Sequence, residues 1–308
     1  MRTIGYYEKM GMLFSDFAGT FPYMKIGESI ERFSCFGGLE NEINFDFFES
    51  LEDSIVRIYM QGYAESSRFI EPGYMLEKPY RELAMAIAGS DAKILNVFKR
   101  AGLGESAGGS LIAQLEREGV LYVEESREAP IDREEKPLLP REFRRYRIQP
   151  KIRFTKPFYR FWFSYVEPFS KELKKGRYDR ALSNYRIHKE RVHSLVFEQL
   201  SSALLRKVMS RRNDPLVSEG SFWERRNEFD IFGISRSGRV ILGECKYRGR
   251  RVCAGELVKL REKAASIGID ADIYALFSYG GFSGELKDME SGEKLCLFDV
   301  EDFETLLE

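Results

Sequence analysis

Two short apolar segments separated by a Ser-Arg-Ser-Gly turn constrain the fold of this chain more than any other feature. They cover residues 228–235 and 240–246, and their spacing predicts two adjacent strands of a sheet. Asp230 lies near the start of the first strand, and the second strand ends in Glu244-Cys245-Lys246. Adjacent strands would bring these charged side chains together. The pair of strands therefore predicts a reactive site as well as a sheet.

The residue types at this point are those that bind a hard divalent cation beside a phosphate. Asp230 and Glu244 offer carboxylate oxygens and Cys245 a backbone carbonyl, so Mg²⁺ or Mn²⁺ is the expected ion. Lys246 would orient the attacking water or offset negative charge on phosphorus. Glu198, on a preceding helix, would help to hold a second ion or orient a water molecule. Together these roles predict metal-assisted hydrolysis of a phosphodiester.

A second interpretation of the same residues is purely structural. Glu-x-Lys also occurs at residues 172–174 and 285–287, so the triplet alone has little specificity. The charged end of an edge strand can form surface salt bridges and nothing more. What distinguishes Glu244 is its place at the end of an apolar strand, with an acid on the strand before it.

Composition argues against several other classes of site and of protein. The four cysteines form no Cys-x-x-Cys pair and the chain has only two histidines, which disfavours zinc ribbons, thioredoxin-type sites and histidine-rich metal sites. The N-terminal residues lack an apolar core of signal-peptide length, and no apolar run approaches a bilayer span. We therefore expect a cytoplasmic protein with no membrane segment.

The net charge of −1 conceals a strong segregation of charge along the chain. Residues 141–251 carry 28 Lys and Arg against 12 Asp and Glu, a local balance of +16, while the remainder balances to −17. A positive middle region is typical of a face that binds a polyanion. The alternative is a solvated helical surface covered by salt bridges.

The order of periodic segments predicts a multidomain α/β (α+β) chain. An acidic, aromatic and mostly helical region comes first, with a helical face over residues 45–59 formed by Phe48, Leu51, Ile55 and Ile58. A winged helix-turn-helix follows, with helices at 80–88, 91–100 (N-capped by Asp91) and 106–118 and wing strands at 120–123 and 146–148. A helix at 188–209, the two strands, a helix at 254–267 and a strand at 272–277 then predict a small mixed sheet flanked by helices. The domains we expect are a helical region at 1–78, the winged helix at 79–150, an aromatic and basic connector at 151–190, and the α/β domain at 191–308.

Candidate contacts to nucleic acid lie in three regions: the winged module, the connector, and residues 225–226 before the first strand of the α/β domain. The third helix of the winged module would enter the major groove, although such modules also serve as packing or protein-contact elements. In the connector, interleaved aromatic and basic residues can stack bases and neutralise phosphates, but the aromatic run at 158–165 is dense enough that we interpret it as buried. The candidate DNA contacts are Ser110, Gln114, Arg117, Lys174, Lys175, Arg225 and Arg226.

Four motifs in order resemble those of a known family. They are Phe197-Glu198, Glu228-Phe229-Asp230, Gly243-Glu244-Cys245-Lys246 and Phe277-Ser278-Tyr279-Gly280-Gly281-Phe282-Ser283. With them the chain, from about Tyr80 onward, resembles the PD-(D/E)xK nuclease-like domain at the C-terminus of archaeal-type ATPases, together with its preceding winged helix. The segments at 146–148 and 161–163 are similar to the stretch that joins these modules, and residues 36–38 are similar to the tail of the ATPase module.

The resemblance implies a restriction-endonuclease-like sheet with Asp230, Glu244 and Lys246 in the motif positions. The chain departs from the family in having no Gly-x-x-x-x-Gly-Lys-Ser/Thr motif, and the glycine-rich run at 102–110 has no lysine to reach a phosphate. We therefore expect no ATP binding by this chain.

Three functional hypotheses follow. The first is a Mg²⁺-dependent nuclease that acts on DNA. The second is a non-catalytic DNA-binding or regulatory protein, and the third is an interaction subunit that works with a separate ATPase.

Overall fold

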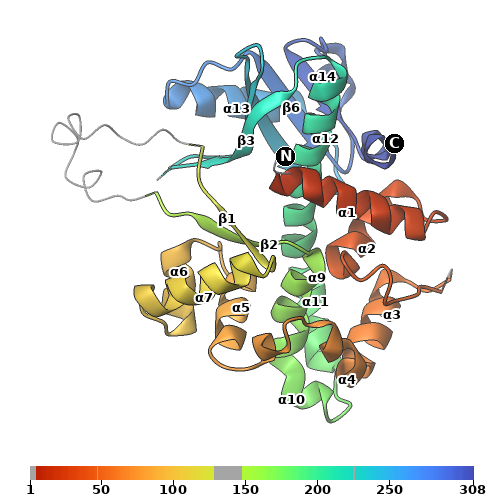
Figure 1. Ribbon diagram of the computed structural model, residues 1–308. Helices are drawn as coiled ribbons and strands as arrows, with labels where there is room; N and C mark the ends of the chain where they lie inside the picture. The colour runs from red at the N-terminus through yellow and green to blue at the C-terminus, as the bar shows by residue number, and fades with distance from the viewer. Residues whose placement is uncertain (1–4, 47, 128–147, 225) are drawn as a thin grey trace. The chain divides into compact units, whose positions relative to one another are not determined.

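The computed structural model describes residues 5–46, 48–127, 148–224 and 226–308, and the chain divides into two compact units (Figure 1). The helical unit comprises residues 1–123, 152–204 and 303–308. The sheet unit comprises residues 124–151 and 205–302. None of the helices in the described ranges combines the length and apolar character needed to cross a bilayer.

The helical unit opens with two regular helices and a series of short ones. Their bounds are α1 (Tyr6–Thr20), α2 (Ile26–Phe36), α3 (Leu51–Ile55), η1 (Val56–Gln61), α4 (Tyr63–Ser66), η2 (Ser67–Phe69) and η3 (Gly73–Leu76). The helix predicted over residues 45–59 begins only at Leu51, because the Ser50 side chain accepts a hydrogen bond from the Asp53 amide and caps the helix there. Phe48 therefore precedes the helix and is 92% exposed, so its place on the predicted apolar face was wrong.

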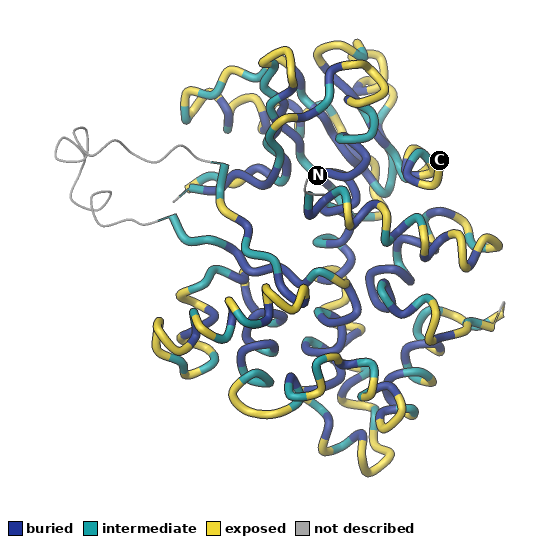
Figure 2. The backbone as a smooth tube through the Cα atoms, in the orientation of Figure 1, coloured by how far each residue is buried: buried dark blue, intermediate teal, exposed yellow. Residues whose placement is uncertain are grey.

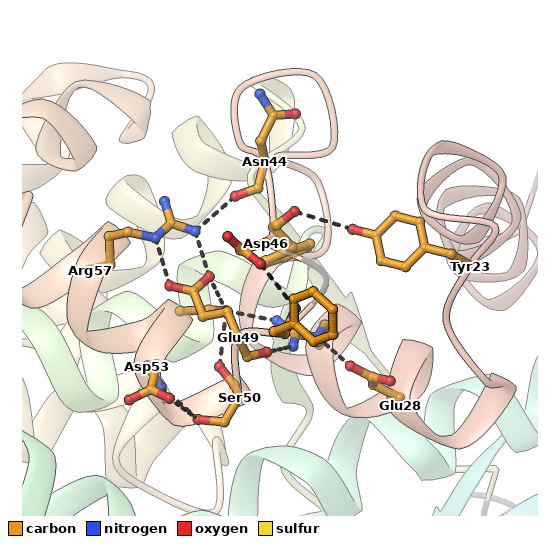
Figure 3. Close-up of polar contacts among 12 residues, drawn as sticks. Tyr23, Glu28, Asn44, Asp46, Glu49, Ser50, Asp53 and Arg57 are labelled. Carbon is orange, nitrogen blue, oxygen red and sulfur yellow. Dashed lines mark hydrogen bonds and ion pairs between the residues drawn. The ribbon is translucent and has the colours of Figure 1, made fainter.

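A polar network holds the segment before α3 against α2 (Figure 3). The buried guanidinium of Arg32 donates hydrogen bonds to Glu28 Oε1 (2.9 Å), to Ser54 Oγ (2.7 Å) and to the main-chain carbonyl of Glu49. The Glu49 carboxylate in turn accepts from Arg57 Nη2 (2.6 Å) and Ser54 Oγ (2.8 Å). The hydrogen bonds from Arg57 are the main cause that lowers the pKa of Glu49.

The aromatic run of the connector is buried, as the sequence interpretation expected. It forms α9 (Pro157–Phe161) and η5 (Trp162–Val166), in which Phe161 and Trp162 have no exposed surface. Phe161 stacks on Tyr59 with ring centroids 5.1 Å apart, and Trp162 stacks on Tyr63 at 5.4 Å. These rings fill the interior of the helical unit and present no platform for nucleic-acid bases. The unit continues with η6 (Glu167–Phe169), α10 (Ser170–Leu173), α11 (Asp179–His188) and α12 (Glu190–Arg211), whose residues up to Leu204 belong to it.

Three helices and a two-stranded sheet reproduce the element order predicted for the winged module. They are α5 (Tyr80–Ala88), α6 (Ile94–Ala101), α7 (Glu105–Arg117), β1 (Leu121–Glu124) and β2 (Lys151–Phe154). Two expectations were wrong in detail. Helix α6 starts at Ile94, because the Asp91 carboxylate accepts hydrogen bonds from Asn96 and from the Lys93 amide in the turn before it. The second wing strand is Lys151–Phe154, whereas Ile148 is not in a strand, and residues 146 and 147 lie outside the described residues.

The sheet unit is built on five strands in the order β3-β4-β5-β6-β7. The first three strands are antiparallel, and β5, β6 and β7 are parallel to one another. The bounds are β3 (Leu216–Trp223), β4 (Glu228–Ser235), β5 (Val240–Lys246), α13 (Ala254–Ser266), β6 (Ile273–Ser278), α14 (Gly284–Asp288) and β7 (Leu295–Phe298), followed by η7 (Glu301–Leu307). The predicted α+β architecture, a helical N-terminal region followed by a mixed sheet with flanking helices, is therefore confirmed.

Apolar side chains from α13 and α14 pack on one face of this sheet. Leu257 and Leu260 of α13 form a cluster with Leu242 of β5 and Leu276 of β6. The central strands β5 and β6 are buried along most of their length (Figure 2). Because the central strands are covered, only their ends can present polar groups to a ligand.

The β4–β5 hairpin has the turn that the sequence predicted. Gly238 occupies the left-handed region with φ of +89°, which a glycine adopts without a Cβ clash. The Asp214 carboxylate accepts hydrogen bonds from the Ser237 amide (2.8 Å) and Arg239 Nη2 (2.7 Å), and the Arg239 guanidinium is the main cause that lowers the pKa of Asp214. Hydrogen bonds therefore hold both the backbone and the side chains of the turn. The fixed turn sets the pairing register of β4 and β5.

Candidate active site

The hairpin register leads from the turn to the candidate site at the far end of β5. It runs from Ile234 opposite Val240 to Ile231 opposite Gly243. Next to this paired region, the Asp230 Oδ2 atom accepts a hydrogen bond from the Cys245 amide at 2.8 Å. The carboxylate of Asp230 therefore lies beside the last residues of β5.

Glu244 and Lys246 lie two residues apart on β5, so their side chains extend from the same face of the strand. The Lys246 Nζ atom donates a hydrogen bond to Glu244 Oε1 at 2.6 Å. The side chains are 16% exposed for Glu244 and 24% for Lys246, so both remain accessible from solvent. The residues of the predicted Glu-x-Lys motif therefore form a contact pair at the strand end.

The pKa of Lys246 is set by opposing effects. Burial favours the neutral amine, but the hydrogen bond that Lys246 donates to Glu244 and the charges of Glu244, Asp230 and Glu256 outweigh burial and raise the pKa of Lys246. The influence of Asp230 on this pKa shows that all three predicted residues belong to one electrostatic cluster. Lys246 is consequently an ammonium ion at neutral pH.

Helix α13 contributes two residues to the cluster that the sequence interpretation did not identify. Lys263 Nζ donates hydrogen bonds to Glu244 Oε2 (3.1 Å) and to the Glu228 carbonyl (2.8 Å). Glu256 Oε2 lies 3.8 Å from Lys246 Nζ. Glu256 and Lys263 are seven residues apart, a spacing that places them on one face of a helix. The seven-residue spacing of Glu256 and Lys263 was visible in the sequence. Only the packing of α13 on the sheet brings these two side chains to the end of β5.

The donor atoms of the cluster fit a hard divalent cation in type. Two carboxylates and the Cys245 carbonyl are oxygen donors of the kind that Mg²⁺ and Mn²⁺ prefer. Among the described residues, no group of three or more His, Cys, Asp or Glu side chains is arranged to hold a metal ion. A cation held by Asp230 and Glu244 would thus need water and substrate oxygens to complete its coordination, as is usual for Mg²⁺.

The remaining predicted catalytic residue belongs to the other unit. Glu198 lies on α12 within the helical unit, where its charge acts on the guanidinium of Arg160. The geometry of the sheet unit therefore brings together Asp230, Glu244 and Lys246 but does not include Glu198.

The candidate DNA contacts on α7 are engaged with neighbouring groups of the protein. The Gln114 side chain accepts a hydrogen bond from the Tyr80 hydroxyl (2.6 Å) and donates to the Tyr74 hydroxyl (2.9 Å). Ser110 Oγ donates to the Ser106 carbonyl, and Arg117 Nε donates to the Ala113 carbonyl. A base contact by Gln114 would have to replace these bonds.

The basic candidates differ in their surroundings. Lys174 Nζ lies 5.6 Å from the centroid of the Tyr63 ring, a cation–π geometry. Lys175 and Arg226 are exposed, and Arg225 lies outside the described residues. These residues are spread over both units, so neither unit alone presents them as one patch.

Comparison with known proteins relates part of this chain to a protein family. Residues 162–260 match the model of the DUF234 family, which is described as archaeal and bacterial proteins of unknown function. The chain matches no curated protein and no solved structure. The matched region contains the β4–β5 hairpin, and it relates this part of the chain to a C-terminal domain of archaeal-type ATPase-related proteins.

Proposed function

We propose that the sheet unit is a Mg²⁺- or Mn²⁺-dependent nuclease domain that hydrolyses phosphodiester bonds in DNA. The observation that carries the proposal is the meeting of Asp230, Glu244 and the protonated Lys246 at the end of β5. A cluster of charged groups in which the pKa of one member is shifted, as that of Lys246 is, is characteristic of functional sites.

Each residue would have a distinct part in the reaction. Asp230, Glu244 and the Cys245 carbonyl would hold the divalent cation, which supplies Lewis-acid polarisation of the phosphate and lowers the pKa of water. The Cys245 amide fixes the orientation of the Asp230 carboxylate through its 2.8 Å hydrogen bond. Lys246 would donate a hydrogen bond to the attacking water or to a phosphate oxygen and offset the charge that develops there. The role predicted from sequence for Glu198, holding a second ion or orienting a water molecule, stays a prediction, since this residue belongs to the helical unit.

A cleavage assay tests this proposal. The purified chain is incubated with Mg²⁺ or Mn²⁺ and with labelled double-stranded DNA, single-stranded DNA or RNA, and EDTA serves as the metal-free control. We expect metal-dependent cleavage of DNA that the double variant D230N/E244Q lacks. We expect K246M to lower the rate by about 10²–10³-fold, the usual effect of removing one group that stabilises developing charge.

A matched control separates the site from general effects of charge removal. Glu285 belongs to another Glu-x-Lys triplet of the same unit and is exposed, so E285Q should cleave at the wild-type rate. Circular dichroism of each variant establishes that the fold is retained. Cleavage that persists in D230N/E244Q would show that these carboxylates do not hold the metal.

One observation favours a second candidate, a non-catalytic DNA-binding protein. Each carboxylate oxygen of Glu244 already accepts a hydrogen bond from a lysine, Lys246 on one side and Lys263 on the other. A cation must compete with both ammonium groups for this carboxylate. This candidate predicts salt-sensitive DNA binding without added metal and no cleavage of any substrate.

The family match favours a third candidate, an interaction subunit. Residues 162–260 are related to a C-terminal domain of archaeal-type ATPase-related proteins. If this chain serves a separate ATPase as a partner subunit, a filter-binding salt series should show negligible affinity for DNA at physiological salt.

A further inference from the structure

A pocket in the helical unit contains an arginine that makes no ion pair or hydrogen bond with any residue the structure describes. The pocket has a volume of about 260 Å³ and lies among α5, η5 and the adjoining parts of α11 and α12. Its polar lining residues are Arg160, Ser164, Tyr165, Asn184, His188 and Arg191. Within the part of the chain that the structure describes, no acidic side chain lines it. The pocket therefore has a positive lining and belongs wholly to one unit.

Arg160 is unusual among the lining residues because its charged group lies partly out of solvent without a bonding partner in the described part of the chain. It is partly buried, and among the described residues no side-chain or backbone acceptor forms a hydrogen bond or ion pair with its guanidinium. Burial, followed by the charges of Arg153 and Arg191, lowers the pKa of Arg160 to about 10, and the charge of Glu198 offsets only part of this shift. A guanidinium removed from water and placed near like charges is costly unless an anion compensates for it.

The surroundings of Arg160 supply further donors for such an anion. Arg191 is exposed at the pocket, and its Nη2 atom donates to the Gly89 carbonyl at 3.3 Å. Gly89 and Arg191 also line a neighbouring open pocket of about 600 Å³, to which Lys99 and Arg100 contribute. Basic side chains therefore continue from Arg160 outward to solvent. Asp91 also lines the open pocket and contributes a negative charge there.

We propose that this pocket binds a phosphomonoester, with Arg160 and Arg191 as its main ligands. Two guanidinium groups with additional hydroxyl, amide and imidazole donors suit the three terminal oxygens of a phosphate. The volume around Arg160 accommodates a phosphate group, and the open neighbouring pocket leaves room for the molecule that carries it. Two sources share this chemistry: the phosphate of a free nucleotide and the 5′-terminal phosphate of a DNA strand.

Thermal unfolding of the full chain tests the proposal with inorganic phosphate as the first probe. At constant ionic strength, phosphate should raise the midpoint of wild-type unfolding relative to chloride, because a ligand that binds only the folded state stabilises it. R160M should lose this rise, and it should unfold at a higher temperature than wild type in chloride, because it removes a partly buried charge that lies near two other arginines. A control variant, R177M, replaces an exposed arginine of the same unit outside the pocket and should behave like wild type.

A second variant and two further ligands complete the test. R191M changes an exposed residue and is expected to fold, and it should weaken phosphate binding by about tenfold, which corresponds to ~1.4 kcal/mol. Calorimetric titration with AMP, and with matched oligonucleotides bearing a 5′-phosphate or a 5′-hydroxyl, identifies the source of the phosphate. No stabilisation by any of these probes, or undiminished stabilisation in R160M, would overturn the proposal.

Discussion

The two adjacent glycines of α7 allow a test of how this helix packs against α6. A Cβ atom built on Gly108 would lie 2.3 Å from two ring carbons of Phe98, whereas one built on Gly109 would have no neighbour within 4 Å. Gly108 is buried against α6, which explains why α7 tolerates a residue of low helix propensity. Alanine at the two positions should therefore have different effects on stability.

The magnitude follows from two terms. Replacing a helical glycine by alanine gains about 1 kcal/mol of helix propensity at either position. At Gly108 the added methyl group must also displace the Phe98 ring, and overpacking of this kind costs about 1–3 kcal/mol. In the difference between G108A and G109A the propensity term cancels, so G108A should be less stable than G109A by about 1–3 kcal/mol.

Urea unfolding followed by far-UV circular dichroism measures this difference. G109A should be more stable than wild type by about 1 kcal/mol. For a unit of this size, each kcal/mol corresponds to about 2–4 °C in the unfolding midpoint, so thermal scans provide a second measure. If G108A stabilised the chain as much as G109A, the close packing of α7 on Phe98 would be refuted.

Three further predictions concern separate parts of the chain. K263M removes one of the two ammonium groups bound to Glu244 and should strengthen Mn²⁺ binding, measured by calorimetry, by roughly tenfold (~1.4 kcal/mol). The control K259M changes a lysine that is 71% exposed and should have little effect. Equal gains in both variants would contradict the contact between Lys263 and Glu244. R32M leaves the buried partners of the guanidinium unsatisfied and should lower the free energy of unfolding by about 2–4 kcal/mol; a change below 0.5 kcal/mol in urea titrations would contradict this. Burial, followed by the charge of a nearby lysine, lowers the pKa of His193 from 6.5 to about 4. The unfolded chain therefore takes up the proton first as the pH falls from 6.5 to 4, which removes up to about 3 kcal/mol of stability. H193L should lack this part of the pH dependence, and parallel stability–pH curves for H193L and wild type would show that His193 does not cause it.

Local sequence was sufficient to predict the hairpin that carries the site. The strands 228–235 and 240–246 were predicted with the bounds that the structure shows, because a clear apolar pattern is bracketed by a turn with a glycine of positive φ. Strand β3 was not predicted, because Glu219 and Gly220 interrupt its pattern and it forms by pairing with β4. Strand β7 was also missed, since its four residues are too short to give a period.

Residue type and strand order were enough to identify Asp230, Glu244 and Lys246 as the chemically capable residues at the end of β5. Their partners, Glu256 and Lys263, came from tertiary structure, because only the packing of α13 on the sheet brings a helix face to the strand end. Arg160 shows the same division. Its type is plain in the sequence, but its lack of an ion pair or hydrogen bond with the described residues depends on how helical segments surround it. Charge and hydrogen-bonding capacity are properties of single residues, whereas burial and compensation arise only from contacts between segments distant in the chain.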